Sequence, residues 1–322
     1  MDYRFKDYRN DRFISIAVAL VCFMVIPPLV NLYFLHIMNL MVIYVLVAIG
    51  LNILVGYAGQ FALTSVAFMA IGAYTTGLLV VRLDWSFWLA LPIAGLLTMA
   101  IGVVVAFPAL RLRGLYLAIV SIAFMLLVHW ILIHWRSVTF GAVGFKVPRL
   151  DFFRLGVPDH LGIYYISLIV TALLVWIATN VLRSQVGRAF VAIRDSEYAA
   201  QSSGISLTLY KTIAFMMSAF YTAIAGGLYA MAVGWLEPGG FHFLQAIMHF
   251  AMIVIGGLGS ITGSIIGAIL ITFIPELLRS ARQFEEIAFG LLLLVFLVFI
   301  PEGLYGLIWR RKRRWREPLL CR

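Results

Sequence analysis

Residues 183–211 read RSQVGRAFVAIRDSEYAAQSSGISLTLYK, the longest internal stretch with dense charge in a sequence that is otherwise strongly apolar. One apolar run ends just before this stretch and another begins at residue 212. Phe190, Ile193 and Glu197 follow helical spacing. Gly204 is placed to end the helix, and Ser206 can cap the next one. A solvated loop needs no apolar Phe190/Ile193 face, so the stretch predicts a short helix at about 188–203 that presses into a partner.

The composition around this stretch is that of a membrane protein. Hydrophobic residues make up 63% of the 322 residues and charged residues 12%, and the mean hydropathy is +1.03. Soluble domains carry about 25% charged residues. Apolar runs of almost 20 residues recur, a length that crosses a hydrocarbon core of about 30 Å. They lack the alternation of barrel strands, so the predicted fold class is an all-α integral membrane protein.

Ten apolar runs are predicted to span the membrane: 13–33, 38–56, 56–80, 86–107, 115–135, 163–182, 211–233, 243–258, 261–278 and 286–308. They form one transmembrane domain, 13–309, between a short N-terminal segment, 1–12, and a basic tail, 310–322. Ten spans place 17 Lys and Arg on the side of 183–211 and 7 on the side of the loop 136–162. The positive-inside rule then puts the charged loop and both termini in the cytoplasm. Nine spans would put the basic tail outside.

Several classes of function are disfavoured by what the sequence lacks. The net charge of +10 gathers at membrane edges, which argues against nucleic-acid binding. Cys22 and Cys321 support no metal framework. The sequence contains no phosphate-binding loop for ATP, no G-x-S-x-G elbow and no H-E-x-x-H pair. No buried catalytic pair or run of carboxylates stands out either. These observations favour a conduit that is not an enzyme, holds no cofactor and draws energy from a partner.

Two glycine-rich stretches, near residues 56–73 and 256–268, each contain a G-x-x-G followed by Gly-Ala. Small residues of this kind either let helices pack closely or interrupt helices that line a pathway at matching positions of two halves. On the second interpretation, Gln60 and Ser65 face a cavity. His249 lies within a predicted span, as either a neutral hydrogen-bonded side chain or a functional group. The candidate pathway residues are Gly56, Gly59, Gln60, Ser65, Gly72, Gly257 and Gly259.

Residues 187–230, GRAFVAIRDSEYAAQSSGISLTLYKTIAFMMSAFYTAIAGGLYA, resemble the ATP-coupling loop and following span of branched-chain amino acid ABC permeases of the LivM type. Further stretches resemble other landmarks of that family: 56–74 (GYAGQ…FMAIGAY), 112–124, 256–268 (GGLGSITGSIIGA) and 301–307. The resemblance implies a type II ABC importer-like permease of ten spans in the bacterial inner membrane. Its partners would be a LivH-type permease, two LivG/LivF-like ATPases that bind ATP and magnesium, a periplasmic solute-binding protein and membrane lipid.

The resemblance also implies which residues couple the permease to an ATPase. The helix at 188–203 would sit in a groove of that subunit, with small residues allowing close approach and charged residues making contacts. The candidates are Arg188, Phe190, Ile193, Arg194, Asp195, Glu197, Ala199, Ala200 and Gly204.

The chain departs from the family pattern in the stretches expected to line the pathway. The family often reads S-L-G-H where this chain has Ala62 to Ser65. A serine common before the GGLG motif corresponds to Ala246, and a proline common after Gly263 corresponds to Ser264. The solute is therefore either a branched-chain or related amino acid, or a urea, short-chain amide or aromatic acid carried by relatives. A stand-alone channel is the alternative from a different class, but a channel needs no docking helix.

Overall fold

The computed structural model describes residues 27, 30–112, 114–148, 158–277 and 290. The predicted spans 13–33 and 286–308 and the terminal segments 1–12 and 310–322 lie wholly or mostly outside these residues. The long helices are α2 (Leu32–Asn52), α3 (Ser65–Leu83), α4 (Phe87–Arg111), α5 (Leu115–His134), α7 (Asp159–Arg183) and α10 (Leu207–Val233). Shorter helices are α6 (Arg136–Thr139), α8 (Gln185–Asp195), α9 (Glu197–Ser202), α11 (Phe243–Gly256) and α12 (Ile261–Leu277). Single turns are η2 (Ile53–Tyr57), η3 (Gly141–Val143) and η5 (Pro238–Gly240), and the strands are β1 (Phe145–Lys146) and β2 (Trp235–Leu236).

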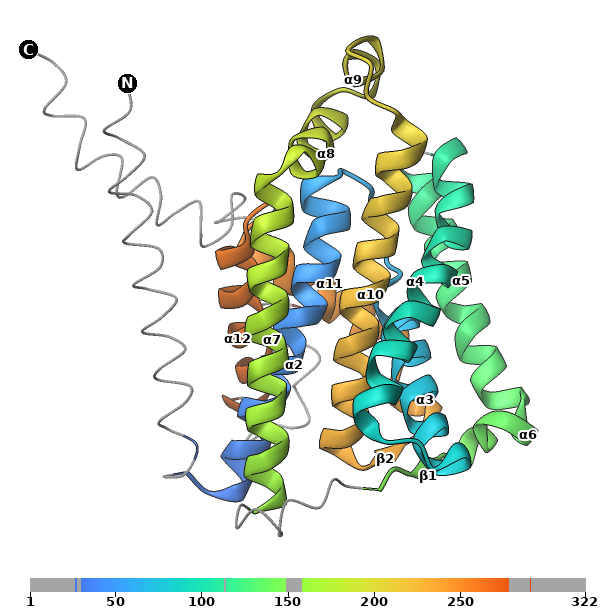
Figure 1. Ribbon diagram of the computed structural model, residues 1–322, viewed down its shortest axis with the longest axis vertical. Helices are drawn as coiled ribbons and strands as arrows, with labels where there is room; N and C mark the ends of the chain where they lie inside the picture. Colours follow the sequence, from blue (N-terminus) through green and yellow to red (C-terminus); the bar gives the residue numbers. More distant parts are fainter. Residues whose placement is uncertain (1–26, 28–29, 113, 149–157, 278–289, 291–322) are drawn as a thin grey trace, which may run out of the picture.

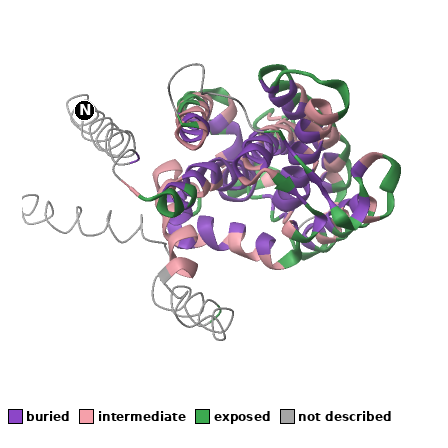
Figure 2. Ribbon diagram, turned by 90° about the horizontal axis from the view of Figure 1, so that it is seen from below, coloured by how far each residue is buried: buried purple, intermediate pink, exposed green. Residues whose placement is uncertain are grey.

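The long helices form a bundle in which α2 and α10 occupy the centre (Figure 1). In the most apolar eighteen-residue stretch of each, 83% of α2–η2 and 72% of α10 is buried, against 33% of α5. Helices α7 and α12 pack against α2, while α3 and α4 pack against α10. Seen from below, buried residues are concentrated towards the middle of the bundle (Figure 2). Large apolar side chains are exposed on the outer helices, as expected where lipid is the solvent.

Seven helical segments of the described residues are long and apolar enough to cross a membrane, and α12 adds a shorter apolar helix. These eight correspond to eight of the ten predicted spans, which confirms an all-α membrane protein. The predicted start of the third span at residue 56 is wrong, because α3 begins at Ser65. The chain between is a π-helical turn and a non-helical segment in which Gly59 has a φ of 69°.

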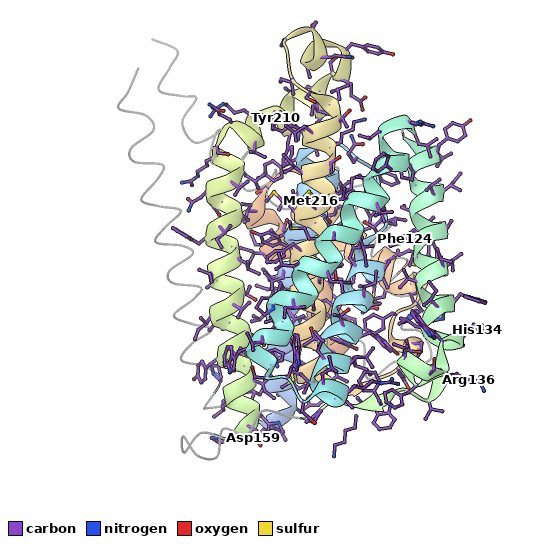
Figure 3. All side chains as sticks on the ribbon, turned by 45° about the vertical axis from the view of Figure 1, so that its right-hand side comes forward. Phe124, His134, Arg136, Asp159, Tyr210 and Met216 are labelled. Carbon is purple, nitrogen blue, oxygen red and sulfur yellow. The ribbon has the colours of Figure 1, made fainter. Side chains whose placement is uncertain are left out.

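Helices α8 and α9 cap one end of the bundle, and the β1–β2 ribbon lies at the other (Figure 1). In the ribbon Phe145 pairs with Leu236, and Lys146 pairs with Trp235. The ring of Tyr74, from α3, lies 5.7 Å from the ring of Phe145. The strand pairing fastens the predicted loop 136–162 to the turn between α10 and α11, and the ring contact fastens the same loop to α3. Tyr210 lies at the α8 end, whereas Arg136 and Asp159 lie at the ribbon end (Figure 3).

Candidate functional site

The charged stretch folds as two helices, so the prediction of one helix at about 188–203 is wrong. Helix α8 ends at Asp195 and α9 starts at Glu197, with Ser196 extended between them at a φ of −162°. The Ser196 side chain accepts a hydrogen bond from the backbone N–H of Ala199, at 3.3 Å. Serine favours this capping conformation over the helix interior. The break therefore follows from a residue that the apolar spacing ignores.

The apolar face of α8 is covered by the chain itself. Phe190 and Ile193 are 0% and 2% exposed, and the Phe190 ring meets the edge of the Tyr210 ring of α10. The expectation that this face presses into a partner is therefore wrong. Its physical cause is that the end of the bundle offers an apolar surface that α8 buries.

The end of α9 confirms the two local predictions made for it. Gly204 has a φ of 81°, and its N–H bonds to the carbonyl of Gln201 at 3.0 Å. The following N–H, of Ile205, bonds to the carbonyl of Ala200. The hydroxyl of Ser206 then accepts a bond from Leu209 at the start of α10. Glycine ends the helix because it adopts positive φ at little cost.

An ion pair fastens α9 to α10. Lys211 Nζ lies 2.7 Å from Glu197 Oε1, and the two side chains are only 2% and 17% exposed. Glu197, predicted to contact an ATPase, thus has an ion-pair partner within the chain. A buried lysine in a membrane protein needs such a partner, because an unpaired charge loses its hydration without compensation.

The surface that α8 and α9 leave open is made by other members of the predicted set. Arg188, Asp195, Ala199 and Gly204 are exposed, whereas Ala200 is buried. Tyr198, which the sequence analysis did not single out, is 75% exposed at the start of α9. An exposed aromatic side chain on a polar tip is the signal that could have found it.

Arg194 connects α8 to both glycine-rich stretches. Its Nη1 donates a hydrogen bond of 2.9 Å to the carbonyl of Gly56. A Cβ atom added to Gly59 would lie 2.9 Å from the Arg194 side chain, and one added to Gly259 would lie 3.0 Å from Nη1. Gly257, beside them, has a φ of 120° that favours glycine. The predicted pathway residues Gly56, Gly59, Gly257 and Gly259 thus come together, and we call this group the glycine junction.

Asn52 closes the glycine junction, and the sequence analysis missed it. Its Nδ2 donates to Ser264 Oγ at 2.6 Å and to the carbonyl of Ser260 at 3.0 Å, while its Oδ1 accepts from the N–H of Gly259 at 2.9 Å. Any side chain at Gly56 would collide with Asn52, since a Cβ atom there would lie 1.8 Å from Oδ1. An amide side chain in an apolar span was the available signal.

The remaining predicted pathway residues lie elsewhere. Gln60 is buried and donates to the nearby carbonyl of Ala58 at 3.2 Å. Gly72 allows α3 to approach α10, since a Cβ atom would lie 2.3 Å from the carbonyl oxygen of Ala223. Close helix packing and interruption of helices, the two interpretations of the glycine-rich stretches, therefore both hold in this chain.

Ser65 belongs to a buried polar group that we call the polar quartet: Tyr44, Ser65, Gln245 and His249. Ser65 Oγ lies 3.2 Å from His249 Nδ1, and both residues are 0% exposed. Gln245 Nε2 donates to the Tyr44 hydroxyl at 3.2 Å, and the Tyr44 and His249 rings are 5.5 Å apart. His249 Nε2 and Gln245 Oε1 are buried without a hydrogen-bond partner. Within the described residues, no cluster of His, Cys, Asp and Glu could hold a metal ion.

Comparison with known proteins fits this arrangement of apolar spans and a capped end. Residues 33–301 match the family described as branched-chain amino acid transport system, permease component. The chain belongs to this family. It is therefore a permease component and a multi-pass membrane protein, a transport subunit rather than an enzyme.

Several bacterial transport permeases are similar to most of the chain. The high-affinity branched-chain amino acid transport system permease protein LivM of Escherichia coli K12 is 33% identical over 302 residues, covering 86% of this chain and 71% of the relative. LivM of Salmonella typhimurium LT2 matches to the same extent. The autoinducer 2 import system permease protein LsrC of Salmonella paratyphi B is 26% identical over 308 residues, covering 91% and 87%. No solved structure gives a significant match.

The departures from the family pattern fall on the buried polar contacts. Position 65, where the pattern has histidine, holds a serine, and His249 of α11 lies against it. Position 264, where proline is common, holds a serine that accepts the bond from Asn52. His249 of α11 therefore supplies an imidazole beside residue 65 in this permease.

Proposed function

We propose that this permease is one transmembrane half of a bacterial ABC importer for branched-chain amino acids. It would lie in the inner membrane with α8 and α9 in the cytoplasm. A second, LivH-type permease would complete the pathway, two LivG/LivF-like ATPases would bind ATP and magnesium, and a periplasmic protein would deliver the solute. The observation that carries the proposal is the cap formed by α8 and α9, held to the bundle by internal bonds while its tip stays exposed.

The tip of this cap is the surface we assign to the ATPase. Tyr198 is 75% exposed and stands beside the exposed Asp195 and Ala199. The Lys211–Glu197 pair and the buried face of α8 keep this surface rigid. A rigid tip can transmit the movement of an ATPase, whereas a flexible loop would absorb it.

Pull-down of the ATPases tests the docking surface. Tyr198→Ala should reduce co-purification of ATPase with this permease by about tenfold or more, as expected for an aromatic anchor worth at least 1.4 kcal/mol. Tyr116→Ala is the matched control, because Tyr116 is 71% exposed at the start of α5, at the same end of the bundle. Equal co-purification of both variants would remove α9 as the docking surface.

Uptake by the whole complex tests the solute. Proteoliposomes containing both permeases and both ATPases, with the binding protein added outside, should import leucine only when ATP is supplied inside. Urea, a short-chain amide and an aromatic amino acid serve as competitors. Uptake of one of these in place of leucine would transfer the proposal to that solute, and leucine flux without ATP would favour a channel.

A further inference from the structure

We propose that the polar quartet is a solute-contact site inside the membrane, closed in this structure, that takes the hydrogen-bonding end of a small amino or amide compound. The inference rests on the proposed import function. It adds a location in the chain and a contact chemistry that the proposed function leaves open.

The polar quartet lowers the stability of the protein in its present form. His249 Nε2 and Gln245 Oε1 are buried in a membrane helix without hydrogen-bond partners. Each buried polar group left in this state destabilises a protein, because nothing replaces the hydrogen bonds that it made to water. Two such groups on one short helix are expensive as packing, but they suit a site that receives its missing partners from a ligand.

Gln245 and His249 are also arranged so that one ligand can contact both. Gln245 and His249 are four residues apart on α11, so their side chains lie next to each other on one face of the helix. Each also has one nitrogen within hydrogen-bonding distance of another helix: Gln245 Nε2 of the Tyr44 hydroxyl on α2, and His249 Nδ1 of Ser65 on α3. These contacts orient the unpartnered atoms as an adjacent pair. Because Oε1 only accepts hydrogen bonds, the pair matches a compact polar group that donates at least one, an ammonium or an amide, rather than a carboxylate or an aliphatic side chain.

Helix α11 ends at the glycine junction, where a movement of α8 can reach it. It ends at Gly256, and Gly257 follows with a φ of 120°. His249 precedes this bend by two turns, a distance of about 10 Å along the helix axis. The bend is part of the glycine junction, which Arg194 joins to α8. A movement of the docked end therefore reaches α11 directly and can expose the polar face that α2 and α3 now cover.

Two replacements of His249 separate the two ring nitrogens. His249→Gln places an amide nitrogen or oxygen near the position of Nε2, whereas His249→Asn reaches only the position of Nδ1. If Nε2 contacts the solute, leucine uptake by the complete importer should remain within about threefold of the parent for Gln. It should fall about tenfold for Asn, the equivalent of one lost hydrogen bond.

Leucine uptake, measured beside thermal stability, separates a binding role from a packing role. His249→Leu removes the unpartnered Nε2, so a residue that served packing alone would leave stability unchanged or raised, with uptake intact. For a solute contact we expect the same stability but a different transport rate: a complex that is at least as stable as the parent but imports leucine about tenfold more slowly.

Labelling tests whether the site opens. With Cys22 and Cys321 replaced, Gln245→Cys should react with a small water-soluble methanethiosulfonate while the complex hydrolyses ATP and not without nucleotide. Ala219→Cys, at a position 0% exposed on α10, should stay unreactive throughout. The site would be overturned, with the import function left standing, if the parent imports leucine but Gln245→Cys stays unreactive while its complex hydrolyses ATP. Wild-type uptake rates in His249→Leu would overturn it as well. Absence of leucine uptake in the parent complex would overturn the import function itself.

Discussion

Gly204 carries a backbone role that no other residue fills at low cost. Its φ is 81°, and a Cβ atom added there would have no heavy atom within 4 Å. A substitution at Gly204 is thus penalised by its conformation and not by collisions. Valine at this position should cost about 1–2 kcal/mol locally and misdirect the exit of α9. We therefore expect the complex that contains Gly204→Val to hydrolyse ATP but to import less leucine for each ATP hydrolysed.

Asparagine provides the matched control at this position, because its side chain tolerates the left-handed region. Gly204→Asn should keep the parent ratio of leucine imported to ATP hydrolysed. Equal ratios for Val and Asn would show that the exit of α9 has no part in coupling.

Lys211 and Glu197 form a pair whose removal should follow the rule for buried charges. Lys211→Met leaves the Glu197 carboxylate in a site where it is 17% exposed, and removal of one partner of a buried pair costs about 3–5 kcal/mol. The double variant Lys211→Met, Glu197→Gln removes both charges and should recover most of that loss. Thermal unfolding of the purified complex measures both, and a double variant less stable than the single one would contradict this account.

Residue-scale prediction from the sequence succeeded where the rule is local. Gly204 and Ser206 were assigned from their positions at helix ends, and those positions depend only on neighbouring residues. The contacts that Phe190 and Glu197 make within the chain were not predicted, because an apolar face or a charge does not say which surface will meet it. Asn52 was missed because its partners lie more than 200 residues away.

At the scale of elements, α8 acts on the bundle through Arg194. Loss of a hydrogen bond from a charged donor costs about 1.5–3 kcal/mol, so Arg194→Ala should lower leucine import per ATP by about tenfold or more. Co-purification of the ATPases should be unchanged, since the guanidinium bonds to Gly56 within the chain. Arg194→Lys keeps the charge but does not reach as far. Its leucine import per ATP should lie between the values of the parent and of Arg194→Ala.

Arg111→Ala controls for loss of an exposed arginine at the same end of the bundle, and it should behave as the parent. If Arg194→Ala instead loses the ATPases as Tyr198→Ala is expected to, Arg194 is a docking residue, as the family resemblance implied.

The helices themselves were largely predictable. Long apolar runs bounded by charge or proline gave α4, α5, α7 and α10 within about four residues, because burial in lipid leaves the backbone few alternatives. Interruption of the helix was one of the two interpretations of the glycine-rich stretch, but its bounds, residues 58–64, were not predicted. This segment and the turn before it bond to Ser121 of α5 and Arg194 of α8, which the local sequence does not reveal.

For the whole molecule, the charge bias makes a topological prediction. Seventeen Lys and Arg on one side against seven on the other place α9 in the cytoplasm and η3 outside. In a protein with both native cysteines replaced, an impermeant maleimide should label Val143→Cys from the periplasm. It should label Gln201→Cys only after the inner membrane is opened. The reverse pattern would invert the arrangement and withdraw α9 from any cytoplasmic ATPase.

The β1–β2 ribbon ties chain segments together at the end of the bundle opposite α8 and α9 (Figure 1). Main-chain bonds join residues 145–146 to 235–236, and Gly77 of α3 lies so close that an added Cβ atom would be 3.0 Å from both Phe145 and Leu236. Such a clasp resists shear, so a pull at the opposite end becomes a rotation about the clasp. We therefore expect the ribbon to act as a fixed joint about which the helices of the permease rotate. In the importer that we propose, we expect the helices to part at the α8–α9 end while the ribbon end stays closed, so that solute leaves towards the cytoplasm without a leak.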